Sequence, residues 1–365
     1  MADSGLTVGV EEEFFLVDTA GLLVNQAPEA LRGADDVDLK PELMRCQVES
    51  ATEICRTADD VRTELTDLRG RLCAGARGQG AMLVASGTVS HTQSKLSVIG
   101  PGTRYHDIAE HVGEFVFSGM TCGCHVHVGV DDRTTALFVA NHIRPWLPVL
   151  LALTANSPFF DGRDTGYASA RHLLWGRWPS AGPPPYISSV DEYEEIVRGM
   201  LGVGAAMDRK MIYWDVRPSE HQPTVEVRVA DVAGTVDEAT LQAVLVRCLV
   251  ADALSSGKPA PKVPTEIIRA AQWRAAKDGI AAELPDPITG ESLGVHEIVD
   301  GLVQRHASEL RAWGELEFVE STLSWLRING DGAHRQRQAF AREGDLDHVV
   351  DMLAAQTRLP GAPKG

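Results

Sequence analysis

The stretch "VGVEEEFFLVD" (residues 8–18) places three consecutive glutamates inside an otherwise apolar segment. Its flanks predict a β-strand over residues 6–17 that is buried on both faces. Side chains alternate between the faces of a strand, so Glu11 and Glu13 share one face while Glu12 points to the other. Buried carboxylates need a compensating cation, because otherwise they protonate. Two carboxylates a pleat apart suit Mg²⁺; the alternative is a solvated edge strand with one polar face.

A second predicted strand, "TCGCHVHVGV" (residues 121–130), carries two histidines on one face, His125 and His127. A single histidine is usually structural, but two on one face beside glycines favour a metal ligand or a phosphate contact. We expect Gly123 and Gly129 to let a bound group approach the backbone.

The cysteines of this strand offer an alternative, a zinc site built from Cys122, Cys124 and the two histidines. Strand alternation argues against it, because the two cysteines fall on the face opposite the histidines.

Further carboxylates recur in "QVESATEICRT", which contains Glu49, and in "TVEVRVAD", which places Glu226 and Arg228 on one strand face. One interpretation is a structural ion pair, which at a surface is common and weak. The functional interpretation assigns Glu226 to a metal and Arg228 to an oxyanion, which the planar guanidinium binds with two hydrogen bonds.

The remaining pattern predicts strands and helices that alternate before a helical C-terminal third. Pro145 and Pro148 are expected to interrupt a helix that begins near Asp132. The other expected elements are strands at 81–87, 211–218 and 224–231, helices at 59–75 and 191–200, a loop at 179–186, and a helical region from 235 onward that is broken at 255–264 and 283–290.

Composition excludes several classes of protein. The 51 acidic residues outnumber the 34 basic ones, which argues against nucleic acid or an anionic membrane as the main partner. We expect no membrane span, since no run of about 18 apolar residues occurs, and no secretory signal. The six cysteines are scattered, which predicts reduced thiols and a cytoplasmic location.

Five ordered motifs together resemble the glutamate–cysteine ligase type 2 family, also called carboxylate–amine ligases. The resemblance runs from Gly9 to about Val232 and more loosely into the helical end. The motifs are "GVEEEFFLVD", "QVESATEICRT", "GCHVHVGV", "RHLLWGRWPSAGPPPY" and "YWDVRPSEHQPTVEVRVADV".

The resemblance implies an α+β fold similar to glutamine synthetase, with a mainly antiparallel sheet that forms a metal and ATP site and is flanked by helices. It implies a catalytic core at 1–257, a helical part of the same unit at 258–357 and a flexible tail at 358–365.

Each motif assigns roles to residues of this chain. The metal ligands are Glu11, Glu13, Glu49, His125 and Glu226, and the nucleotide contacts are His125, His127, Arg177 and Arg228. Arg171, Trp175, Arg217 and Thr52 fall on the substrate side, and Arg228, His127 and Arg171 are the catalytic candidates.

The implied reaction is ATP-dependent formation of an amide through an acyl phosphate, by default from glutamate and cysteine. The cofactors would be ATP and Mg²⁺, or Mn²⁺ in its place; the partners would be small molecules, with a homodimer as a family-level expectation. Two alternatives stay open: a metal-dependent amidohydrolase, whose barrel also uses an HxH strand, and a non-catalytic nucleotide or amino-acid binding protein.

Two segments depart from the family pattern. Many members have an "ALGTHPF"-like segment where this chain has "ASGTVSHTQSK", which displaces the histidine to His91. Many also have an arginine after "RPS", where this chain has "EHQP". We expect both departures to lie on the substrate side.

Overall fold

A computed structural model describes residues 5–32, 38–93, 98–118 and 120–358. Its centre is a seven-stranded antiparallel sheet in which six strands follow the order β2-β3-β1-β5-β9-β8. The seventh strand, β4, pairs with the C-terminal end of β1, whereas β5 pairs with its N-terminal part. The strands are β1 (Val8–Val17), β2 (Leu39–Pro41), β3 (Gln47–Ala51), β4 (Met82–Val84), β5 (Gly123–Gly129), β8 (Val216–Pro218) and β9 (Thr224–Asp231).

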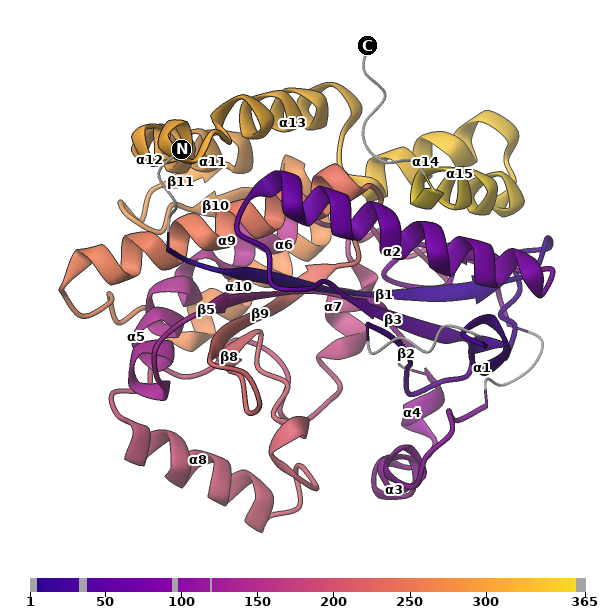
Figure 1. The fold of residues 1–365 in the computed structure, drawn as a ribbon, viewed down its shortest axis with the longest axis horizontal. Coiled ribbons are helices and arrows are strands. Elements are labelled where there is room, and N and C mark those ends of the chain that lie inside the picture. The colour runs from indigo at the N-terminus through magenta and orange to yellow at the C-terminus, as the bar shows by residue number, and fades with distance from the viewer. Residues whose placement is uncertain (1–4, 33–37, 94–97, 119, 359–365) are drawn as a thin grey trace.

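Helices cover the two faces of this sheet unequally (Figure 1). One face packs against α2 and α9, with the C-terminal helices beyond them, whereas α3, α4 and α8 flank the other face. The helices are α1 (Ala27–Ala30), α2 (Ala58–Gly78), α3 (Thr103–Val112), α4 (Phe115–Ser118), α5 (Arg133–Ile143), α6 (Leu147–Leu153), α7 (Ala170–Trp175), α8 (Val190–Gly202), α9 (Val236–Ser256), α10 (Thr265–Asp278), α11 (Val295–Arg305), α12 (Ala307–Trp313), α13 (Leu316–Asn329), α14 (Gly332–Glu343) and α15 (Leu346–Arg358).

The predicted α+β architecture with a helical C-terminal third is confirmed. Side-chain caps explain where the main helices begin: Thr57 and Thr235 form capping boxes at α2 and α9, and Asp132 caps α5. The two prolines do interrupt the next helix, since a 3-10 turn, Arg144–Trp146, separates α5 from α6.

Three predicted segments differ from the structure. Of the strand expected at 211–218 only β8 forms, because the preceding residues pair with the proline-rich loop: Asp215 N donates to Gly182 O. The strand expected at 81–87 ends at Val84, since Ala85 N donates to the Thr357 hydroxyl. The expected break at 283–290 begins a hairpin of β10 (Glu283–Pro285) and β11 (Ser292–Gly294).

Two helical segments are long and apolar enough to cross a membrane, Arg133–Leu153 and Val236–Ser256. Their most apolar windows are 89% and 72% buried inside the protein, as the core helices of a globular domain are. The expectation that the chain does not span a membrane therefore stays a prediction.

The predicted boundary near residue 257 does not divide the core. One hydrophobic cluster contains Val126 of the sheet, Leu249 of α9, Ala275 of α10 and Leu323 of α13. The division into 1–257 and 258–357 stays a prediction. The predicted tail lies outside the described residues apart from Arg358, which ends α15.

Candidate active site

The three glutamates of β1 are separated as strand alternation predicts. Glu12 is fully buried on the helix-covered face, where Arg69 of α2 donates to both of its carboxylate oxygens at 2.6 and 2.9 Å. Arg69 also donates to the backbone carbonyl of Ala233 and lies over the Phe14 ring. The middle glutamate is thus neutralised by a structural ion pair, and only Glu11 and Glu13 are available to a site.

The other face of the sheet collects the predicted ligands from four strands. Glu13 pairs with Glu49 of β3, and Glu11 pairs with His125 of β5. His127 of β5 pairs in turn with Glu226 of β9. One row of neighbouring strands therefore brings together residues that are more than 200 positions apart in the sequence.

Three of these residues could hold a metal ion. Single ligand atoms of Glu11, His125 and Glu226 lie within 4.8 Å of one another. Carboxylate oxygens with one imidazole are a donor set that suits Mg²⁺ or Mn²⁺. Glu13 lies beside them, and its Oε2 accepts a hydrogen bond of 2.7 Å from Gly123 N.

The carboxylates of the site differ in how their charge is compensated. Burial raises the pKa of Glu49 well above its usual value, and the charges of Glu11, Glu42 and Glu13 add to the effect. Burial also opposes ionisation of Glu11, but hydrogen bonds with His125 and His127 outweigh it and lower its pKa. The Glu49 side of the cluster therefore carries excess negative potential, which a bound cation would neutralise.

The two histidines have opposite protonation tendencies. Burial and the charge of Arg228 lower the pKa of His125, so its imidazole is neutral, as a metal ligand must be. Burial also opposes protonation of His127, but its hydrogen bond with Glu11 and the charge of Glu226 raise its pKa. The Nε2 atom of His127 lies 3.6 Å from Glu11 Oε1 and 3.9 Å from Glu226 Oε1, so it faces two carboxylates.

Two arginines hold Glu226 in place. Arg217 Nε donates to Glu226 Oε2 at 2.8 Å, and Arg228 Nη1 donates to Glu226 Oε1. Burial alone would raise the pKa of Glu226, but the charges of Arg228 and Arg217 lower it. Glu226 and Arg228 share one strand face as predicted, and they form the ion pair that the structural interpretation expects.

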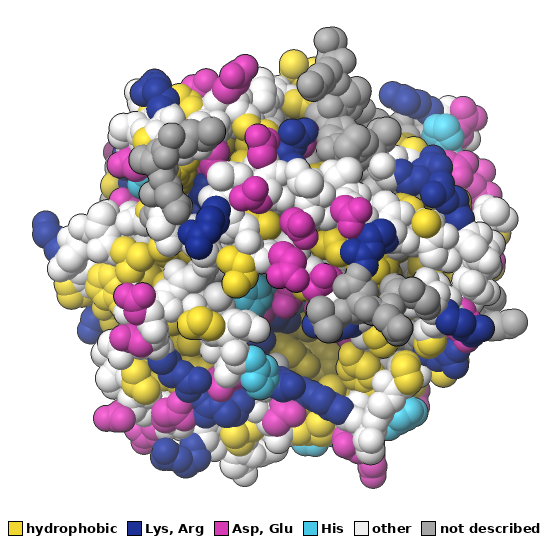
Figure 2. Space-filling view, in the orientation of Figure 1, with side chains coloured by type: hydrophobic (Ala, Val, Ile, Leu, Met, Phe, Trp, Pro, Cys, Tyr) yellow, Lys and Arg dark blue, Asp and Glu magenta, His cyan; other side chains and the backbone are white. Residues whose placement is uncertain are grey.

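Two cavities meet at this cluster. The first, of about 480 Å³, extends from the carboxylates toward α3 and α4; the second, of about 630 Å³, follows the ends of β1 and β5. Glu11, Lys40, His127 and Gln222 line both cavities, so one of the candidate metal ligands, Glu11, stands at their junction, while Glu226 lines the first cavity only. Figure 2 shows a hollow on this face with acidic side chains above it and a hydrophobic floor.

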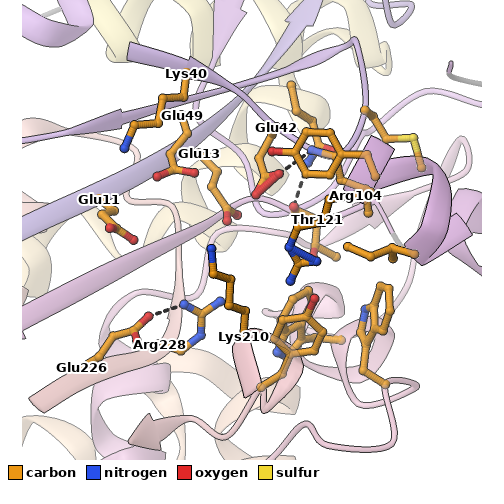
Figure 3. Close-up of a pocket in the computed structure, with 18 of the residues that line it drawn as sticks. Glu11, Glu13, Lys40, Glu42, Glu49, Arg104, Thr121, Lys210, Glu226 and Arg228 are labelled. Atoms are coloured by element: carbon orange, nitrogen blue, oxygen red, sulfur yellow. Dashed lines mark hydrogen bonds and ion pairs between the residues drawn. The ribbon is translucent and has the colours of Figure 1, made fainter. Parts of the chain in front are cut away.

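Four charged residues in the first cavity were not predicted from the sequence: Lys40, Glu42, Arg104 and Lys210. Figure 3 shows Lys210 directed toward the carboxylates of Glu11 and Glu13. Burial and the neighbouring charge of Glu13 raise the pKa of Glu42 to about 7. Register is the signal that could have found Lys40, since it pairs with Glu49 across β2 and β3.

The predicted substrate-side residues divide into three groups. Trp175 and Arg217 line the first cavity, whereas Thr52 lines the second and accepts a hydrogen bond from Val10 N. Arg171 and Arg177 line neither cavity. Arg171 is buried behind β9, where it donates to the carbonyls of Arg228 and Val229; Arg177 is exposed.

The expectation for the glycines of β5 needs correction. A Cβ atom at Gly123 would overlap the Arg171 guanidinium, and one at Gly129 would meet the Thr7 hydroxyl. The close approach that these glycines permit is therefore made by the protein's own side chains.

The two departures from the family pattern occupy different places. His91 lines neither cavity and contacts Asp347 of α15 at 2.9 Å, so the placement of this segment on the substrate side stays a prediction; its last two residues, 94–95, lie outside the described residues. The second departure does lie at the site, because His221 and Gln222 line the first cavity. Glu220 turns away and pairs with Arg209 and Arg133.

The cysteines lie outside the group of residues that could hold a metal ion in the described part of the chain. Cys122 and Cys124 are buried in hydrophobic clusters, and none of the six cysteines forms a disulfide. We predict that the double variant Cys122→Ala/Cys124→Ala keeps most of its ATP-dependent activity and that the wild type holds no stoichiometric zinc. Elemental analysis with activity assays checks this; zinc that is present in the wild type and absent from the variant would contradict it.

Comparison with known families shows to which family the chain belongs. The family model described as glutamate–cysteine ligase family 2 matches residues 7–352. The chain belongs to this family. A Rhodococcus jostii (strain RHA1) relative that carries the provisional name glutamate–cysteine ligase 2-1 is 47% identical over 356 residues, or 96% of each chain. A Nocardia farcinica (strain IFM 10152) relative with the same provisional name is 43% identical and covers 98% of this chain and 95% of its own.

Solved structures share the fold of this family member. Glutamate–cysteine ligase from Francisella tularensis in complex with AMP matches with a TM-score of 0.71 and 14% identity, over 97% of this chain and 89% of the other. A bifunctional glutathione synthetase from Pasteurella multocida gives the same TM-score at 15% identity, over 97% of this chain and 52% of that one. The protein is thus an ATP-dependent carboxylate–amine ligase of the glutamate–cysteine ligase type, which acts on small molecules.

Proposed function

We propose that the protein activates a carboxylic acid as an acyl phosphate with ATP and transfers the acyl group to an amine. Glutamate is the proposed acid, and cysteine is the acceptor that the family name suggests. The observation that carries the proposal is the junction of two cavities at Glu11 and His127, where Glu11 is also one of the three candidate metal ligands. Phosphoryl transfer needs a donor and an acceptor on opposite sides of such a cluster.

The second cavity is the proposed nucleotide site. Leu6, Ile54 and Pro223 give it apolar wall for a base, and Ile54 is 75% exposed there. The Thr52 hydroxyl lines the same cavity and lies near Gly9 of β1. A nucleotide whose base contacts the apolar wall would direct its phosphates toward His127 and Lys40 at the junction.

The proposed metal ligands are Glu11, His125 and Glu226, with Glu13 and Glu49 beside them for a second ion. A bound Mg²⁺ or Mn²⁺ would neutralise phosphate charge and align the γ-phosphate with the acid. The raised pKa of Glu49 supports this, since it marks negative charge that the protein's own cations leave uncompensated.

The cationic residues have distinct proposed roles. His125, neutral and within reach of Glu11, is the metal ligand, and His127, whose raised pKa favours the cationic form, contacts a phosphate oxygen. Arg228 and Lys210 face the cluster from the opposite wall, where they would stabilise the transferring phosphoryl group. Arg171 positions Arg228 by donating to its backbone carbonyl.

Water has to be kept from an acyl phosphate, because hydrolysis would waste it. Trp175 and Trp178 line the first cavity, and their ring centroids lie 5.9 Å apart. The "GPPP" loop is anchored beside them by the bridge between Gly182 and Trp214. We assign to this loop and the two tryptophans the exclusion of water.

The remaining proposals concern the setting of the enzyme. The formal charge of −17 supports the absence of nucleic acid and membrane partners, and six scattered cysteines that form no disulfide support a reducing cytoplasm. A homodimer is proposed from the family resemblance alone.

Removal of divalent metal tests the proposed site directly. With an acid substrate present, we expect a chelator to abolish ADP release and added Mg²⁺ or Mn²⁺ to restore it, because the carboxylates cannot hold the phosphates alone. Coupled measurement of ADP across a panel of amino and dicarboxylic acids checks this. Full turnover in excess chelator, or amide hydrolysis without ATP, would contradict the proposal.

A further inference from the structure

We propose that the amine acceptor is an α-amino acid with a large apolar side chain, bound in the part of the first cavity that α3, α4 and α7 enclose. This inference rests on the proposed function. We call this part the apolar chamber; its walls are Met44, Ile108, Val116, Met120, Trp175 and Trp178.

The walls of the apolar chamber form one hydrophobic cluster that is distinct from the two clusters packed on the sheet. Tyr213 joins the two tryptophans, with ring centroids at 5.0 Å from Trp175 and 5.3 Å from Trp178. Mutual packing of three aromatic rings fixes this wall, so the space is preformed. A pocket that is mostly apolar with few polar groups selects a ligand with an apolar body.

Two buried donors in the same cavity have no hydrogen-bond partner among the described residues. They are Arg104 Nη1 and Trp175 Nε1. The other terminal nitrogen of Arg104 donates to Asp208 Oδ1 at 3.1 Å, which holds the guanidinium in place. Figure 3 shows Arg104 directed into the cavity. Unpaired donors, one of them cationic, favour an anionic acceptor, and the carboxylate of an amino acid supplies one.

Glu42 is the residue that we expect to bind the amino group of the same ligand. Its carboxylate lines the first cavity, and Figure 3 shows it between Glu13 on one side and Arg104 on the other. An ammonium group at Glu42 therefore lies between the apolar chamber and the candidate metal ligands, next to the place of the acyl group. The ammonium gives one proton to the Glu42 carboxylate and, as the free amine, forms the C–N bond, while the bond from carbon to phosphate oxygen breaks. Phosphate leaves with the electron pair and takes up the proton that nitrogen loses.

The cysteine side chain is too small to fill the apolar chamber. Its side chain is one methylene and a thiol, which would leave most of the apolar wall without contacts. Each additional methylene that fills an apolar pocket improves kcat/KM by roughly 10–200-fold. Phenylalanine, leucine or methionine would contact the aromatic wall that cysteine does not reach.

The test begins with the wild-type enzyme, Mg-ATP and a panel of acids, with hydroxylamine as the acceptor. Hydroxylamine needs no apolar chamber, so hydroxamate formation reports the proposed ligase reaction by itself. With the acid that reacts, the acceptors alanine, cysteine, leucine, methionine, phenylalanine and phenethylamine are then compared by kcat/KM. We expect at least one of leucine, methionine and phenylalanine to exceed cysteine by about tenfold or more.

A variant tests the carboxylate contact. Arg104→Gln is expected to lower the kcat/KM ratio of phenylalanine to phenethylamine by on the order of tenfold or more, since only phenylalanine has the carboxylate. Arg198→Gln is the matched control, because Arg198 is exposed on α8 and lines neither cavity; it should leave the ratio unchanged.

The outcomes separate the two proposals. Failure of every acid to give hydroxamate overturns the proposed function and this inference with it. Hydroxamate formation with cysteine as the best acceptor, or with no coupling to any amine of the panel, overturns the apolar chamber as the acceptor site alone. An unchanged ratio in Arg104→Gln overturns the assignment of the acceptor as an amino acid.

Discussion

Glu13→Gln is expected to lower ATP-dependent turnover by on the order of 100-fold or more, with little change in stability. Glutamine keeps the shape of the side chain and an oxygen that can accept the hydrogen bond from Gly123 N. It removes one negative charge from a group that faces Glu49, Glu42 and Arg228. Loss of that charge weakens the hold on the metal and on the phosphates that the metal would bridge.

Steady-state kinetics at saturating ATP and metal, with the thermal midpoint measured in parallel, check this prediction. Glu195→Gln on the exposed side of α8 is the matched control and should behave as the wild type. A Glu13→Gln enzyme with activity within a few-fold of the wild type would remove Glu13 from the site.

Glu12→Gln, one position away, is expected to show the opposite pattern, a large loss of stability. Glu12 and Arg69 are almost completely excluded from solvent and form a two-pronged ion pair. Removing one partner leaves an uncompensated buried charge, which costs about 3–5 kcal/mol in the free energy of unfolding. Arg69→Met should lower the free energy of unfolding by a similar amount, because it leaves the buried Glu12 carboxylate without its cation.

A double-mutant cycle separates the pair from other effects of each substitution. The combined Glu12→Gln/Arg69→Met variant should lose much less than the sum of the two single losses, since no unpaired charge is left. Denaturant midpoints of the four proteins give the coupling free energy. Single losses below about 1 kcal/mol, or strict additivity, would show that the pair does not stabilise the sheet.

Strand alternation was enough to sort the glutamates correctly. The pattern that placed Glu11 and Glu13 on one face depends only on the two-residue period of a strand, and β1 obeys it over ten residues. The same period set His125 and His127 apart from Cys124 of β5. The resemblance of the ordered motifs to the family identified Glu49 and Glu226 as candidate ligands. Both lie on strands of the same sheet as Glu11 and Glu13, so the pairing of the strands brings them to one site.

Residues whose position depends on the packing of helices and loops could not be found this way. Arg69 meets Glu12 through the docking of α2 on the sheet, 57 positions along the chain. Arg104 and Lys210 come from α3 and from the 3-10 turn Arg209–Met211, and neither has a local pattern that points to a cavity. Arg171 shows the converse, since its motif suggested substrate contact while its side chain lies behind β9.

Trapping with hydroxylamine tests the central claim most directly. The wild-type enzyme is incubated with Mg-ATP, hydroxylamine and glutamate, and then with other amino and dicarboxylic acids. Attack at the γ-phosphate is favoured where carboxylate-held metal and Arg228 surround it, so we expect the γ-glutamyl hydroxamate together with equal amounts of ADP and phosphate. Formation of AMP and pyrophosphate would replace the acyl phosphate with an acyl adenylate, and binding of Mg-ATP without hydroxamate from any acid would contradict the account.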